Sequence, residues 1–173
     1  KDGIPVDGAG ATTILDGGVK TTHSVAVNGM TFSNMTIRHS DGTAGEGLFR
    51  MDNGGFVTDL SLSGVVFDGQ GIAGVHGILG QGLIGTVTVT GCTLENIANW
   101  AVFDSDSGGG EGDVGLTAFV FTDNIVRNND GAIALRGCRV VGSLTSTATI
   151  TGNAFSNMNE NFEPCSYPAN QCG

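Results

Sequence analysis

The stretch TATITGNAFSNMNE at residues 147–160 repeats almost the same order of residue types as TVTVTGCTLENIAN at residues 86–99. In both stretches apolar side chains alternate with threonines, a glycine follows, and a large apolar residue returns three positions later. Alternation with a period of two is typical of a half-buried β-strand, and glycine tolerates the backbone of a sharp bend. Each stretch therefore predicts a strand, a bend and a second strand.

Three further stretches follow the same pattern, namely MTFSNMTI at 30–37, LSLSGVVF at 60–67 and FVFTDNIV at 119–126. The pattern recurs about every 30 residues, which is typical of a solenoid. Aligned, the stretches give two inward apolar columns. The first column holds Met30, Leu60, Val87, Phe119 and Ala148, and the second holds Phe32, Leu62, Val89, Phe121 and Ile150.

Each repeat also predicts a corner and further strands. The corner column contains residue types that tolerate turns, and an inward apolar column follows it. These columns hold Asn34, Gly64, Gly91, Asp123 and Gly152, and then Ile37, Phe67, Leu94, Val126 and Phe155. We expect Asn96, Asn128 and Asn157, which share a later column, to hydrogen-bond from coil to coil. Additional short strands are expected at 47–51, 76–80, 100–104 and 131–135.

The stretch TATITGNAFSNM at 147–158, together with the lead-in VDGAGATTILDGG at 6–18, resembles the right-handed parallel β-helix superfamily, also called pectin-lyase-like, with its PbH1-type repeats. The resemblance implies an all-β solenoid of about five to six coils over residues 6–160. We expect a single domain over residues 1–173, with a disulfide-closed cap at 161–173. The superfamily includes lyases, hydrolases, epimerases, adhesins and inert spacers, so the resemblance implies a fold and not an activity.

Composition narrows the range of partners. The net charge is −10, so most of this surface would repel DNA or RNA, and we expect no nucleic-acid partner. No apolar run approaches the roughly 20 residues of a membrane helix, so we expect no membrane span. Of the 173 residues 39% are hydrophobic, which suits a real core.

Catalytic candidates are few. Glycoside hydrolysis requires two carboxylates across one bond, and the sequence offers no convincing pair. The candidates for catalysis are Asp130, Arg136 and Arg139, which share one repeat with Asp123 and Arg127. The alternative interpretation of this group is an exposed ion-pair patch. We therefore expect a non-catalytic protein, and a polysaccharide-active lyase, hydrolase or epimerase is the alternative.

The acidic segment DSDSGGGEGD at 104–113 is the candidate metal site. Ca²⁺ takes six to eight oxygen ligands on a flexible loop, and the segment places several carboxylates among glycines. The candidate calcium ligands are Asp104, Asp106, Glu111 and Asp113. The alternative is a solvated insertion between coils. The sequence establishes no cofactor, and calcium is the one candidate.

Two outward rows of hydroxyl side chains are the candidate ligand face. These rows include Thr31, Ser33, Thr88, Thr90, Thr149 and Thr151. A flat face of this kind could contact ice or a glycan. Threonine is also a favourable strand residue without any ligand.

The cysteines indicate a compartment. A disulfide between Cys165 and Cys172 would close a short terminal loop and place the protein in an oxidising, extracellular setting. Cys92 lies in the column of Met35 and Val65, which predicts a buried thiol, although a bridge from Cys92 to Cys138 stays open.

These observations favour a non-catalytic, secreted or cell-surface β-helix with a structural, adhesive or self-assembling role. The expected partners are further copies of the chain, stacked end to end, or a glycan. The open ends of a solenoid must be capped, covered or used, and this requirement motivates the stacking hypothesis.

Overall fold

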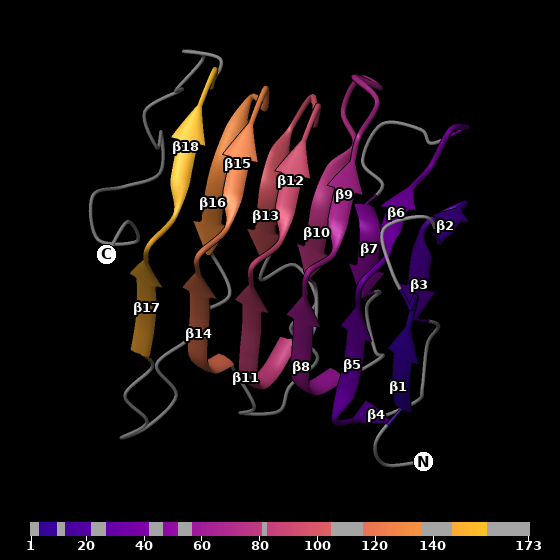
Figure 1. Cartoon of the computed structure of the whole chain (residues 1–173). Coiled ribbons are helices and arrows are strands. Elements are labelled where there is room, and N and C mark those ends of the chain that lie inside the picture. The colour runs from indigo at the N-terminus through magenta and orange to yellow at the C-terminus, as the bar shows by residue number, and fades with distance from the viewer. Residues whose placement is uncertain are drawn as a thin grey trace.

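The structure, a computed structural model, describes residues 4–9, 13–21, 27–41, 47–51, 57–80, 83–104, 116–135 and 147–158. Within these ranges the regular secondary structure consists of β-strands only, and all paired strands are parallel. The strands form three sheets that run the length of a parallel β-solenoid (Figure 1). The prediction of an all-β parallel β-helix is confirmed.

Three faces of the solenoid each carry one sheet, here called sheets A, B and C. In order across sheet A lie β1 (Ile4–Asp7), β5 (Met30–Ser33), β8 (Val57–Ser63), β11 (Leu83–Thr90), β14 (Leu116–Thr122) and β17 (Thr147–Thr151), with β4 (Val27–Asn28) beside β8. Sheet B contains β2 (Ile14–Asp16), β6 (Thr36–Arg38), β9 (Val66–Asp68), β12 (Thr93–Glu95), β15 (Ile125–Arg127) and β18 (Ala154–Ser156). Sheet C contains β3 (Val19–Thr21), β7 (Gly47–Met51), β10 (His76–Gly80), β13 (Trp100–Asp104) and β16 (Gly131–Leu135).

One coil uses a strand of each sheet in turn, as in β11, β12 and β13, and the chain then enters β14 beside β11. This path places residues about 30 positions apart side by side. The register pairs Val87 with Leu60 and Phe119, and Val89 with Leu62 and Phe121. The inward columns predicted from the sequence are therefore confirmed.

The corner between sheets A and B turns through the left-handed backbone region. Asn34, Gly64, Gly91, Asp123 and Gly152 have φ between +53° and +69°. Residues with a Cβ rarely adopt this conformation, and Gly, Asn and Asp adopt it most easily. The residue types in the corner column therefore reflect the backbone geometry of the turn.

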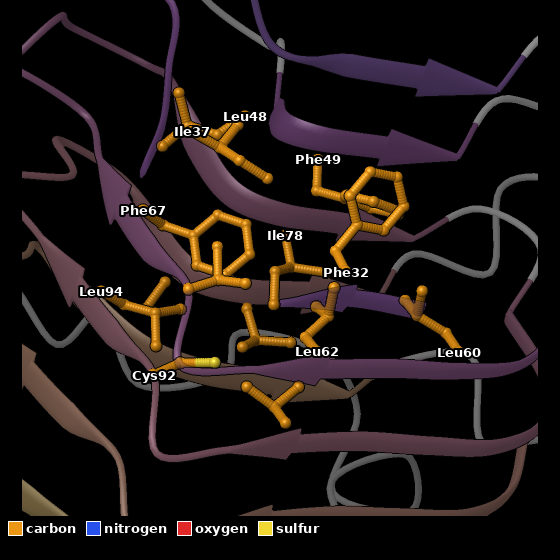
Figure 2. Close-up of a cluster of buried hydrophobic side chains, with 14 of the residues drawn as sticks. Phe32, Ile37, Leu48, Phe49, Leu60, Leu62, Phe67, Ile78, Cys92 and Leu94 are labelled. Carbon is orange, nitrogen blue, oxygen red and sulfur yellow. The ribbon is translucent and has the colours of Figure 1, made fainter. Parts of the chain in front are cut away.

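The inward side chains form one continuous core. Phe67, Phe119 and Phe121 are among the largest fully buried side chains, each no more than 1% exposed. Figure 2 shows Phe32, Phe67 and Leu94 turned toward the interior with residues of the neighbouring strands. Burial of one such side chain contributes about 1.5–3 kcal/mol, so the stacked columns supply much of the folding free energy.

The inward columns become exposed at both ends of the stack. Leu15 on β2 is 38% exposed, and Ile150 on β17 and Phe155 on β18 are 46% and 45% exposed.

Within the described ranges, the structure contains no helix with the length and apolarity that a membrane crossing requires. The expected terminal cap at 161–173 lies outside the described residues.

Candidate functional site

An open depression of about 480 Å³ lies where the chain leaves sheet B. Its lining combines carboxylates, amides and small residues from three successive coils. The lining residues are Asp68, Gln70, Gly71, Asn96, Ala98, Asn128 and Asp130. The solenoid brings these residues together because each follows or ends a strand of sheet B.

The local backbone turns the polar side chains into this corner. Gln70, Asn96 and Asn128 have φ of 53°, 55° and 56°. A positive φ directly follows β12 and β15 and comes two residues after the end of β9, and asparagine tolerates this conformation. In these three coils the corner therefore presents one amide each.

The amides form a ladder that runs along the solenoid. Asn157 donates from Nδ2 to Oδ1 of Asn128 at 3.1 Å, and Asn128 donates in the same way to Asn96 at 3.2 Å. Asn96 then donates to Oδ1 of Asp68 at 3.0 Å. The prediction that Asn96, Asn128 and Asn157 hydrogen-bond from coil to coil is confirmed. The ladder ends on Asp68, a carboxylate that sequence reasoning did not include.

Asp130, a candidate for catalysis, lies on the wall of the depression. Its side chain is exposed, and its backbone N–H donates to the carbonyl of Ile97 at 3.1 Å. Asp68, which also lines the depression, accepts a second hydrogen bond from the backbone N–H of Gln70 at 3.0 Å. The other two candidates, Arg136 and Arg139, lie outside the described residues.

The described arginine of this repeat pairs with an acidic residue of the preceding coil. Arg127 contacts Glu95, with Nε and Nη2 at 2.7 and 2.5 Å from Oε2. The register sets this pair, because Arg127 and Glu95 are direct partners across β15 and β12. The sequence expectation had grouped Arg127 with Asp123 and Asp130 of its own repeat.

The candidate calcium segment is only partly described. Asp104 ends β13, and Asp106, Glu111 and Asp113 lie outside the described residues. Among the residues that are described, no group of three or more histidine, cysteine or acidic side chains could hold a metal ion. Calcium binding at this segment stays a prediction.

The outward hydroxyl rows follow the predicted register on sheet A. Thr88 is the partner of Ser61 and Val120, and Thr90 of Ser63 and Thr122. The hydroxyl groups of Thr90 and Thr122 lie 3.0 Å apart and form one hydrogen bond. Thr31, Ser33, Thr88 and Thr90 are half-buried, and Thr149 and Thr151 are exposed. Some hydroxyl groups of these rows thus hydrogen-bond to one another, and others face solvent.

Two titratable side chains are buried in the core. Cys92 is a free thiol, and burial raises its pKa to about 11. His76 on β10 is 8% exposed, and burial lowers its pKa to about 4, so the imidazole is neutral at pH 7. The buried thiol expected at Cys92 is confirmed. Cys138, Cys165 and Cys172 lie outside the described residues.

Buried asparagines are a feature that sequence reasoning missed. Asn124 and Asn129 are each 1% exposed and donate side-chain hydrogen bonds to the carbonyl oxygens of Val89 and Leu94, both at 3.0 Å. Asn124 lies in the column of Met35, Val65 and Cys92, and this position is the one signal that marks its burial.

Comparisons of the chain with protein-family models, with curated proteins and with solved structures find no significant match. The functional argument therefore rests on the geometry described above.

Proposed function

We propose that the protein is a non-catalytic β-helix module of the cell exterior with a structural, self-assembling role. The observation that supports it best is the exposure of core columns at both ends of the stack, at Leu15, Ile150 and Phe155. Exposed apolar residues on an open sheet edge favour association with another strand. An interface that repeats from one end to the other produces a fibre.

The hydrogen bonds and the ion pair made by the polar side chains support a structural role for the protein. Asp68 accepts two hydrogen bonds at the end of the amide ladder, and Glu95 is bound to Arg127. Both carboxylates thus bond to a side chain of the neighbouring coil and hold the two coils together. We assign the protein to the right-handed, pectin-lyase-like β-helix superfamily on its resemblance in repeat pattern, and within that superfamily to the structural members.

The extracellular setting in this proposal rests on the pair Cys165 and Cys172. A disulfide between them requires an oxidising compartment. Thiol titration of the denatured, unreduced protein tests this step. Two reactive thiols, Cys92 and Cys138, are expected, and four would contradict an oxidised terminal loop.

The proposed role is tested by measuring assembly and activity on the same preparation. Sedimentation and electron microscopy are expected to show concentration-dependent linear assemblies. Incubation with acidic and neutral polysaccharides, with and without Ca²⁺, is expected to give no cleavage. Cleavage that Asp130→Asn abolishes would replace this proposal with the polysaccharide-active alternative.

Glycan binding is a second candidate function, favoured by the depression beside the amide ladder. An asparagine side chain has two N–H groups and an oxygen with two lone pairs, and each ladder bond uses one donor or one acceptor. The remaining capacity, with the exposed carboxylate of Asp130, suits the hydroxyl groups of a sugar. Binding measured by calorimetry and weakened by Asp130→Asn, but not by Thr149→Ala on sheet A, would support this function.

A further inference from the structure

The two ends of the solenoid expose strands that belong to the same columns. β1 and β2 are the first strands of sheets A and B, and β17 and β18 are the last in the described part of the chain. Val6 on β1 begins the column that ends at Ile150, and Leu15 on β2 begins the column that ends at Phe155. A second copy placed at the β17–β18 edge would therefore continue both apolar columns without a change of register.

The polar residues at the two edges are complementary as well. Asp7 ends β1, and its column ends at Thr151; Asp16 ends β2, and its column ends at Ser156. Stacked in register, each exposed carboxylate of one copy meets a hydroxyl donor of the other. Ionised carboxylates have about four lone-pair positions, so they accept such a bond in addition to those that they already hold.

In the column that runs from Asp16 to Ser156, carboxylates accept hydrogen bonds from the neighbouring strand within the chain as well. Asp16 accepts from Arg38 at 3.0 Å, and Glu95 accepts from Arg127, in each case across neighbouring strands of sheet B. Ser156 follows Arg127 in that column. A contact from Ser156 to Asp16 of a second copy would extend the series.

Backbone hydrogen bonds at the corners give the rule for the junction. The N–H of Asp123 donates to the carbonyl of Thr151 at 3.0 Å, and the N–H of Gly8 donates to the carbonyl of Ser33 at 2.9 Å. At this corner the N–H of one coil thus bonds to the last strand residue of the following coil. By this rule the N–H of Gly152 meets the carbonyl of Asp7 in the next copy.

We propose that the β1–β2 edge of one copy docks on the β17–β18 edge of another, with Thr151 beside Asp7 and Phe155 beside Leu15. This inference rests on the proposed self-assembly and adds the interface and its register. The occupant of each edge is a second copy of the same chain. The junction is heterologous, so it propagates into a linear assembly.

Disulfide trapping tests the register. Thr151→Cys and Asp7→Cys variants of the 173-residue chain are mixed and oxidised, and cross-linked peptides are identified by mass spectrometry. Neighbouring in-register Cα atoms lie within the range that a disulfide spans, so an intermolecular 151–7 link is expected. Thr149→Cys mixed with Asp7→Cys is the control, because an offset of two residues places the pair beyond that range.

A matched pair of charge variants tests the interface. Phe155→Asp is expected to lower the assembled fraction at least about tenfold at fixed protein concentration, because the junction would bury an unpaired carboxylate. Ile125→Asp is the control, since Ile125 is 44% exposed but lies on β15, inside the stack. Equal assembly of the two variants would overturn the inference.

The outcomes separate the two proposals. Absence of assembly at every concentration contradicts the self-assembling role and the junction together. Assembly with cross-links in another register, or without the 151–7 link, overturns the junction and leaves the role in place. Assembly of the chain only after removal of residues 159–173 would show that its own C-terminal segment occupies the edge, and would also overturn the junction.

Discussion

The side-chain oxygen of Asn124 accepts the backbone N–H of Cys92 at 2.8 Å, although both residues are only 1% exposed. The Nδ2 group of Asn124 donates to the carbonyl oxygen of Val89 at 3.0 Å. One amide therefore satisfies two buried backbone groups of the preceding coil, at the corner where the β11–β14 ladder ends. A polar side chain is tolerated in the core because its hydrogen bonds are made.

Replacing this amide is expected to be costly. Asn124→Leu removes the side-chain partner of the buried N–H of Cys92 and one hydrogen bond to the carbonyl of Val89, and we expect a loss of about 3 kcal/mol in the free energy of unfolding. The control is Asn128→Gly, which removes an exposed ladder amide at a positive φ and is expected to cost below about 1 kcal/mol. Urea denaturation compares the two, and equal losses would contradict the bonding role of Asn124.

The position of a side chain along its column is expected to decide its contribution to stability. Phe67 is fully buried and Phe155, in the same column, is 45% exposed. Phe67→Ala is expected to cost about 3–5 kcal/mol through cavity formation. Phe155→Ala is expected to cost below about 1 kcal/mol in the unassembled protein. Thermal and urea unfolding at low protein concentration measure both variants, and a large loss for Phe155→Ala would show that the end of the stack is covered.

The corner geometry is tested at Gly91, which has a φ of +60° and no atom within 4 Å of an added Cβ. Gly91→Ala is expected to lower the free energy of unfolding by about 1 kcal/mol, because an L-residue is strained in this region. Gly91→Asn is expected to cost less, since asparagine occupies the same corner at Asn34 with a φ of 53°. The ranking of the two unfolding midpoints is the readout, and the reverse order would argue against backbone strain.

A pH dependence follows from the buried imidazole of His76. Its pKa falls from 6.5 to about 4 on folding because burial disfavours the charged form. The free energy of unfolding is therefore at its full value, as far as His76 is concerned, above pH 6.5. It falls as the pH drops from 6.5 toward 4, because the unfolded state then binds a proton that the folded state does not. The pKa values of Asp7 and Asp16 are lowered by hydrogen bonds, first from the backbone N–H groups of Ala9 and Ser40, so these carboxylates stay ionised in that window. Urea midpoints at pH 7.5 and 4.5 are expected to differ less for His76→Gln than for the parent chain.

Much of the fold is predictable because one period governs it. Alternation along 86–90 and 147–151 decides which side chains face inward, and the 30-residue spacing aligns the columns across sheet A. The corner residues are predictable for the same reason, since a positive φ at Gly91 or Asn34 restricts the residue type. Both features follow from local chemistry repeated at a fixed interval.

The depression and its bonding were harder to predict. Asp68, Asn96 and Asp130 are far apart in sequence, and their proximity depends on how each corner leaves sheet B. The pair Arg127–Glu95 was missed because residues of one repeat were grouped together, whereas the β12–β15 register joins residues of neighbouring repeats. Burial of Asn124 was missed because asparagine after Asp123 suggests an exposed turn.

Cryo-electron microscopy of the purified 173-residue chain tests the self-assembling role most directly. The expected result is a filament in which β17 and β18 of one copy continue into β1 and β2 of the next at the inter-strand spacing of about 4.8 Å that is general for β-sheets. Particles that stay single at all concentrations would contradict the self-assembling role, and filaments whose sheets are interrupted between copies would contradict the proposed junction.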